Sequence, residues 1–299
     1  MKKIILVLVL LLAACTPVSR QALPTATITL QSLINNTSAG GTLVVPINTY
    51  IGNVSITKSI TIEGNGSTIQ GRIQVDGSNV TIKNLIISKP VMYGLLSRGD
   101  NAIYENIAIL NTQLSTDCSG CNDMDGIRVA GNNVSLKNIK IDLSGVANIG
   151  TAHPDCVQFA TWNKRASNIT IDGLTCENYY PNAGGTGSSG FQLATEKYGW
   201  ENVSIKNSVL HTATCILAYD GQSGLIFEHN TCIGENATGS MGFYSAKNTG
   251  DYFNSNILVK HLQSVNVSGG VTSSANNIIY CGSRSCTIYS LPSTGQLFN

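Results

Sequence analysis

Charge is scarce in this sequence of 299 residues. Only 12% of the residues are Asp, Glu, Lys or Arg, against about 25% in an ordinary soluble domain. The formal net charge is +1, and no run of Lys or Arg is interleaved with aromatic residues. Binding to nucleic acid or to an anionic membrane surface relies on a basic patch, so the composition gives no basis for either partner.

Long apolar runs are also lacking beyond the first residues. Lys2 and Lys3 precede a single apolar run, residues 4–12, which is too short to span a bilayer and is typical of a secretory signal. It ends in LAAC (12–15), which resembles the bacterial lipobox and implies lipidation of Cys15. We therefore expect a signal peptide (1–15), a flexible tether (16–26) and one domain (27–299). The protein would be exported and held at the outer membrane or cell surface by its lipid alone.

Eight of the nine cysteines remain after Cys15. An even number in an exported chain permits disulfides, and the cysteines of CSGC (118–121) and CGSRSC (281–286) are close enough for local bridges. These two pairs lie too far apart in the sequence to suggest a shared zinc site. Cys176 and Cys232 fall at inward positions of expected strands, where we expect buried free thiols.

One strand-like pattern recurs along the chain. Its copies alternate apolar and polar residues with period two, and each is interrupted by Asn or Gly, which marks a bend. The copies begin 22 to 35 residues apart, which is the size of one turn of a solenoid. They are NVTIKNLII (79–87), NAIYENIAI (101–109), NVSLKNIKI (133–141), NITIDGLTC (168–176) and NVSIKNSVL (202–210), with weaker copies at 224–232 and 256–264.

A second, shorter strand falls between the copies, for example at 93–97, 125–129 and 155–159. Each turn thus carries at least two strands, and stacked turns would form parallel sheets around a continuous apolar core. The equivalent asparagines at the bends would stack as a ladder of side-chain amides. These asparagines are Asn84, Asn106, Asn138 and Asn207.

The first residues of the expected domain support the same architecture. Leu30, Leu33 and Ile34 have helical spacing, and they are followed by Gly40-Gly41 and then by strands. This arrangement resembles the N-terminal cap helix and first coil of right-handed parallel β-helix proteins of the pectin-lyase-like superfamily. The resemblance covers residues 27–290 and implies an all-β fold, a single right-handed parallel β-helix. It does not name a reaction, because this scaffold carries several chemistries.

Extra residues lengthen the turns at 111–123, 143–154, 177–188 and 233–240. All four insertions precede a shorter strand, so they would project from one side and wall a groove. Aromatic and basic side chains at this groove would bind sugar rings. The candidates are Tyr179, Tyr180, Lys197 and Tyr219, together with Gln158 and Gln192 on the strands.

Alignment of the shorter strands places Asp125 directly below Asp155, with coils about 4.8 Å apart. The same alignment points Ile127, Val157 and Phe191 inward and Arg128, Gln158 and Gln192 outward. Asp123 and His153 precede the two aspartates by two residues each. A lone Asp before Gly is commonly a turn residue. Together, however, these groups form an acidic cluster that a metal, a cation or a shared proton must relieve.

Three functions are compatible with this cluster. In the first, Asp123, Asp125 and Asp155 resemble the acidic calcium cluster of pectate-lyase-like enzymes, which implies Ca²⁺ as a cofactor. The metal would neutralise a uronate carboxylate while Arg128, His153 or Lys197 removes the neighbouring proton.

In the second, Asp125 and Asp155 match acids in the NTDG and DDC motifs of polygalacturonase-like glycoside hydrolases. Pro154 stands at the first acid of the second motif, so Asp123 or His153 would supply the proton. In the third, the groove binds a glycan or displays a surface without catalysis. We expect a monomeric, extracytoplasmic enzyme that cleaves a polysaccharide, with a metal-assisted lyase acting on an acidic glycan ahead of the hydrolase.

Overall fold

The computed structural model describes thirteen segments of the chain. They are residues 28–114, 123–144, 152–161, 163–179, 188–193, 197–219, 224–234, 241–246, 251–261, 263–267, 271–281, 287–289 and 296–298. The expected signal peptide, Cys15 and the tether lie outside them, as do Tyr180 and the CSGC pair. Within the described residues, no helix is long and apolar enough to cross a membrane.

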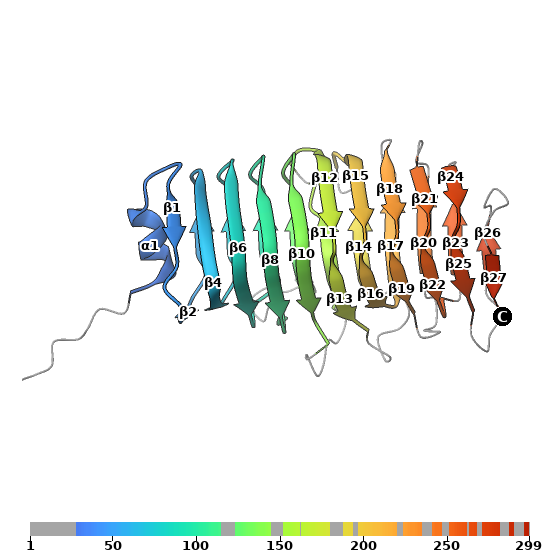
Figure 1. The fold of residues 1–299 in the computed structure, drawn as a ribbon, viewed down its shortest axis with the longest axis horizontal. Helices are drawn as coiled ribbons and strands as arrows, with labels where there is room; N and C mark the ends of the chain where they lie inside the picture. Colours follow the sequence, from blue (N-terminus) through green and yellow to red (C-terminus); the bar gives the residue numbers. More distant parts are fainter. Residues whose placement is uncertain are drawn as a thin grey trace, which may run out of the picture.

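The described strands form one right-handed parallel β-helix, as the repeats predict (Figure 1). A short helix, α1 (Leu30–Asn36), closes its N-terminal end and buries Leu30 and Ile34. Thr29 caps the start of the helix, because its hydroxyl accepts a hydrogen bond from the Ser32 amide (3.1 Å), which satisfies one of the first free amides.

The strands lie in two sheets, and every pairing between them is parallel. Sheet A has 17 strands: β1 (Thr42–Val44), β2 (Thr49–Ile51), β4 (Ile60–Gln70), β6 (Val80–Ser88), β8 (Ile103–Leu110), β10 (Ser135–Asp142), β12 (Ala166–Asp172), β13 (Thr175–Asn178), β15 (Trp200–Lys206), β16 (Val209–Thr212), β18 (Leu225–Glu228), β19 (Thr231–Ile233), β21 (Asp251–Asn254), β22 (Ile257–Val259), β24 (Val271–Ala275), β25 (Ile278–Tyr280) and β27 (Gln296–Phe298). Sheet B has 10 strands, which stack in chain order: β3 (Val54–Ile56), β5 (Ile73–Val75), β7 (Tyr93–Ser97), β9 (Asp125–Val129), β11 (Asp155–Phe159), β14 (Ser189–Leu193), β17 (Thr214–Tyr219), β20 (Met241–Ala246), β23 (Gln263–Val267) and β26 (Thr287–Tyr289).

The register of sheet B agrees with the register expected from the sequence. Val157 pairs with Ile127 on one side and with Phe191 on the other. All three side chains are buried in the core between the sheets. Gln158 pairs with Arg128 and with Gln192, so these three polar residues form a row across sheet B. We call it the polar row.

Asparagine ladders stabilise the bends between strands. The Asn106 amide donates to Asn84 (2.9 Å), and the Asn138 amide donates to Asn106 (3.2 Å), as expected. Asn207 does not join this ladder, because Gly173 takes the left-handed position of the intervening coil and Asn207 donates to Asp172 instead (2.8 Å).

A longer ladder was not expected from the sequence. It runs through the first asparagine of each repeat, with amide-to-amide hydrogen bonds of 2.9 to 3.1 Å. Its five members are Asn79, Asn101, Asn133, Asn168 and Asn202, and all have positive φ, between 51° and 57°. Asn tolerates this left-handed conformation better than most residues and keeps an amide for the next coil.

Two disulfides cross the core from sheet B to sheet A, so the expectation of free thiols at Cys176 and Cys232 is wrong. Cys156 of β11 is bonded to Cys176 of β13, and Cys215 of β17 is bonded to Cys232 of β19. The inward positions were correctly predicted, but each cysteine faces a second one from the opposite sheet. Disulfides form outside the reducing cytosol, which supports an extracytoplasmic location. Cys281 is also disulfide-bonded, and Cys286 lies outside the described residues.

The five-residue ladder predicts a measurable cost for replacing its central member. Asn133→Ala removes the hydrogen bonds to Asn101 and Asn168 and places a Cβ-bearing residue without a local polar partner at φ 54°. We expect a loss of about 2 kcal/mol in the free energy of unfolding, measured by urea denaturation. Asn133→Gly loses the same hydrogen bonds but accepts the backbone angle, so it should lose about half as much. Equal losses in both variants would contradict the backbone argument.

Candidate functional site

The acidic cluster forms on the outer face of sheet B, where β9 and β11 begin. Asp123 and His153 face each other in an isolated parallel bridge. Asp125 and Asp155 open the two adjacent strands, and the Asp155 amide donates to Asp125 Oδ1 (3.1 Å). The structure thus brings together the four residues that the sequence alignment placed side by side.

Arg128 lies inside this cluster rather than beside it. Its Nε donates to Asp125 Oδ2 (2.7 Å), and its Nη2 donates to Asp123 Oδ2 (2.7 Å). Its guanidinium also lies 5.4 Å from the centre of the Tyr93 ring. The residue is only 4% exposed. Burial lowers the pKa of Arg128, but the carboxylates of Asp125 and Asp123 outweigh it, so its pKa is raised above the ordinary value. Arg128 is therefore a fixed cation and is poorly suited to remove a proton.

The two strand-opening aspartates are fully buried. Burial raises the pKa of Asp125 well above its usual range, although Arg128 opposes this and Asp155 adds to it. Burial also raises the pKa of Asp155, while its contact with His153 partly lowers it. Two carboxylates this close disfavour each other's ionisation, so Arg128 and His153 are the cations that offset them.

Like Asp123, whose side chain is 36% exposed, His153 remains partly open to solvent. Its Nδ1 lies 3.2 Å from Asp155 Oδ2, and its side chain is 35% exposed. The hydrogen bond to Asp155 raises the pKa of His153 to about 9, against an opposing effect of burial. His153 is consequently protonated at neutral pH, with Nδ1 directed at Asp155 and Nε2 left for another partner.

Gln192 connects His153 to the polar row. With its amide nitrogen turned toward the cluster, Gln192 donates to Asp155 Oδ2 (2.5 Å), and the same nitrogen lies 3.1 Å from His153 Nδ1. Gln158, 7% exposed, lies between Gln192 and Arg128 in the register. The His153 imidazole is therefore in contact with the polar row through Gln192.

The remaining predicted residues are not part of this cluster. Tyr179 stacks on His211, with ring centres 5.0 Å apart, and Lys197 lies over the Tyr198 ring, with Nζ 4.9 Å from its centre. Neither forms a hydrogen bond or ion pair with the cluster within the described residues. Tyr219 ends β17, but its side chain lies outside the described part, as does Tyr180.

The sequence reasoning missed two supporting residues. Tyr93, on the coil before β9, pairs with Asp125 and lies against Arg128. Asn178, at the end of β13, is buried, and its amide donates to Pro154 O (2.8 Å) and Ser189 O (3.2 Å). This amide fixes the segment that carries His153 and Asp155. The repeat pattern could have located Tyr93, because it opens its strand as Asp125 opens the next one.

The cluster does not fit the calcium site expected from the resemblance. Ca²⁺ requires several converging oxygen ligands, but the guanidinium of Arg128 already lies between the carboxylates of Asp123 and Asp125. Within the described residues, which include all three aspartates, no three His, Cys, Asp or Glu side chains are arranged to hold a metal ion. We therefore derive no chemical step through calcium.

Comparison with solved structures finds the same fold in polysaccharide lyases. An alginate lyase from Paenibacillus sp. str. FPU-7 matches with a TM-score of 0.58 and 15% identity, over 90% of this chain and 94% of that chain. A PL6 alginate lyase in complex with a trisaccharide has a TM-score of 0.47 and 12% identity, over 84% of this chain and 56% of that chain. Pectate lyase Pel9A has a TM-score of 0.46 and 10% identity, over 89% and 72%.

No protein-family model and no curated protein matches the sequence. At such low identities, the likeness to the Paenibacillus enzyme establishes the right-handed parallel β-helix and leaves the chemistry to be argued from the site.

The buried ion pair predicts a strong dependence of stability on Arg128. Arg128→Met leaves Asp125 buried without its cation, and we expect a loss of about 3–5 kcal/mol in the free energy of unfolding at neutral pH. The double variant Arg128→Met/Asp125→Asn also removes the unpaired buried carboxylate, and it should recover at least half of the lost free energy of unfolding. Denaturation of the two variants and the wild type measures both values. No recovery in the double variant would contradict the pairing.

Proposed function

We propose that this chain is an extracytoplasmic polysaccharide lyase that cleaves an acidic, uronate-containing glycan by β-elimination. The observation that carries the proposal is the His153–Asp155 pair: a half-buried imidazole, oriented by a buried carboxylate, on the outer face of sheet B beside the buried cation Arg128. The fold likeness to an alginate lyase over most of both chains supports the same reaction class by analogy.

His153 is the best base among the three candidates named from the sequence. Arg128 is held by two carboxylates, and Lys197 is exposed and lies against Tyr198. In the proposed reaction, His153 Nε2 removes the proton on C5 of the uronate, next to its carboxylate. The electron pair forms the C4=C5 double bond while the C4–O bond breaks. The imidazolium then returns the proton to the departing oxygen, which balances the step.

The polar row would stabilise the negative charge that develops on the uronate carboxylate in this step. Proton removal next to a carboxylate builds negative charge on that carboxylate, and donors already in place stabilise it. Arg128 provides a fixed positive charge, and the Gln158 side-chain amide lies beside it on the same row. Because Arg128 offsets Asp123 and Asp125, the cluster presents less negative charge to an anionic glycan than three free aspartates would.

This role predicts an alkaline activity profile. The base must be neutral, and the pKa of His153 is raised to about 9, so kcat/KM should rise about tenfold per pH unit and level off above pH 9. Asp155→Asn removes the carboxylate that raises the pKa, so the rise should shift to lower pH. Rate profiles of the two proteins test this. A rate that falls above pH 9 would indicate an acid role for His153 instead.

A substrate panel tests the reaction class. Purified protein is incubated with polyuronates and with neutral polysaccharides, each with added Ca²⁺ or with a chelator. Products are followed both by the ultraviolet absorbance of the unsaturated sugar and by reducing ends. We expect absorbance from a polyuronate that persists in chelator and falls by a factor of about 10² or more in His153→Ala. Asp142→Asn, on sheet A, serves as the matched carboxylate control.

The other outcomes of this panel identify the alternatives. Reducing ends without absorbance would replace the lyase with a glycoside hydrolase, for which the full burial of Asp125 and Asp155 offers no support. A folded protein that yields neither signal from any glycan would favour a binding module. Absorbance that requires Ca²⁺ would show that metal chemistry operates in addition to the residues described.

A further inference from the structure

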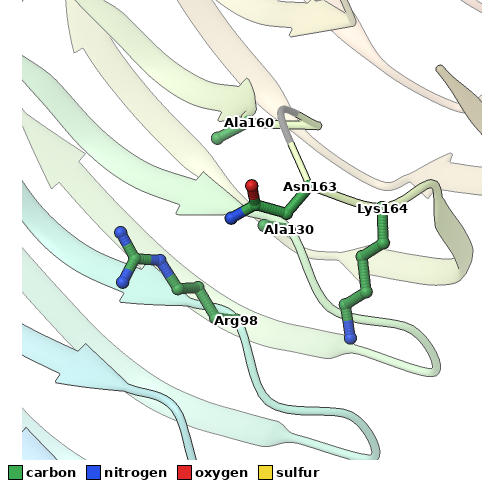
Figure 2. Close-up of a pocket in the computed structure, with 5 residues that line it drawn as sticks. All are labelled: Arg98, Ala130, Ala160, Asn163 and Lys164. Atoms are coloured by element: carbon green, nitrogen blue, oxygen red, sulfur yellow. The ribbon is translucent and has the colours of Figure 1, made fainter. Parts of the chain in front are cut away.

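A cavity of about 170 Å³ opens at the other end of the strands that carry the acidic cluster. Asp125 and Asp155 begin β9 and β11, whereas the cavity residues follow the last residues of β7, β9 and β11. Three consecutive coils therefore build the cavity, as Figure 2 shows. The lining residues are Arg98, Ala130, Ala160, Asn163 and Lys164.

The cavity and the polar row lie on the same face of sheet B. Ala130 follows Arg128 by two residues, and Ala160 follows Gln158 by two, so strand alternation places them on the same face, about 7 Å further along. His153 lies against Gln192 at the other side of this row. Asp155 and Ala160 are five residues apart along β11 and the residue that follows it, or about 17 Å at ~3.3 Å per residue. The cavity therefore lies beyond the sugar that contacts His153 and would hold a sugar further along the same glycan chain.

The lining suits a sugar ring with a carboxylate. The methyl groups of Ala130 and Ala160 line the cavity together with the side chains of Arg98, Asn163 and Lys164 (Figure 2). Such a combination of apolar walls and few polar groups is typical of small-ligand sites. The volume is below the range usual for drug-sized ligands, and therefore suits a single ring.

Arg98 is the cation lining the cavity that has N–H donors available for a ligand. Its Nη1 contacts Asp76 at 3.4 Å, which is longer than the usual charge-assisted hydrogen bond, and a guanidinium has five N–H donors. Lys164, in contrast, is held by Asp100 at 2.5 Å. The Asn163 side chain forms no hydrogen bond within the described residues, and in Figure 2 its amide lies between Arg98 and Lys164.

The turn next to the cavity is tightly packed. The chain turns directly behind Ala130, and a Cβ added at Gly131 would lie 2.1 Å from Gly99 O. Backbone is therefore in direct contact with backbone at this turn. Because the coil is fixed there, the space above Ala130 depends on the small side chains at these positions.

We propose that this cavity is a subsite for one uronate residue of the glycan, further along the chain from the residue that is cleaved. Arg98 binds the uronate carboxylate, Asn163 bonds to a hydroxyl or to the same carboxylate, and the methyl groups of Ala130 and Ala160 pack against the ring. The acidic identity of the glycan rests on the proposed function, whereas the cavity and its cation are observed directly.

Calorimetric binding of oligouronates tests this subsite without turnover. The probes are tetramers of mannuronate, guluronate and galacturonate, and each is titrated into the His153→Ala protein. We expect Arg98→Gln and Ala130→Leu, added to this background, to raise the Kd of the bound tetramer at least about tenfold. Arg165→Gln is the matched control, because Arg165 is adjacent to Lys164, pairs with Glu201 (2.9 Å) and does not line the cavity. It should change the Kd by less than about twofold.

A chemical variant of the probe separates charge from shape. The bound tetramer with its carboxylates reduced to alcohols should show the same Kd with Arg98 and with Arg98→Gln, because it no longer carries the charge that Arg98 would bind. Unchanged Kd values in both Arg98→Gln and Ala130→Leu would overturn the subsite, as would the absence of binding by any tetramer. Thermal unfolding of each variant confirms that the fold is kept.

The two proposals can fail separately. Product from the wild type with no effect of Arg98→Gln or Ala130→Leu on binding would overturn the subsite and leave the lyase. Binding that depends on Arg98 and Ala130, with no product from the wild type, would overturn the lyase and leave the subsite.

Discussion

Every feature of this molecule depends on the parallel stacking of one coil upon the next. Coil-to-coil hydrogen bonding places like positions of successive repeats directly above each other, about 4.8 Å apart. Ile127, Val157 and Phe191 consequently form one continuous core row, and asparagines meet asparagines at the bends. Stacking favours residues whose side chains can hydrogen-bond to an identical side chain in the next coil. Asparagine can do so, and it therefore recurs in phase with the repeat.

The same stacking has an unfavourable consequence at the candidate site. It places an aspartate beside an aspartate, both fully buried, where two negative charges repel strongly. The chain resolves this with two cations of different character. Arg128 is permanent and almost inaccessible, whereas His153 can release its proton and is partly open. This division separates the group that holds the cluster together from the group that is available for chemistry.

Sequence reasoning located the fold and the juxtaposition of Asp125 with Asp155, because both follow from the repeat period and strand alternation. It missed what depends on the path of the chain across the core. Cys156 pairs with Cys176 because the two sheets face each other, which spacing along the chain does not reveal. Alternation likewise placed Arg128 outward, but only the structure shows it turned back between two carboxylates. The cavity at Ala130 and Ala160 could not be found from a sequence motif either, because it results from the small size of these two side chains.

Both disulfides close a loop within a single coil, between cysteines 20 and 17 residues apart in sequence, and neither joins one coil to the next. Contacts between coils therefore rest on hydrogen bonds, ion pairs and packing in these two turns. In each of these two coils, the strand of sheet B is therefore joined covalently across the core to a strand of sheet A. The two disulfides thus maintain the cross-section of these two turns, and neither adds a covalent link from one turn to the next beyond the backbone itself.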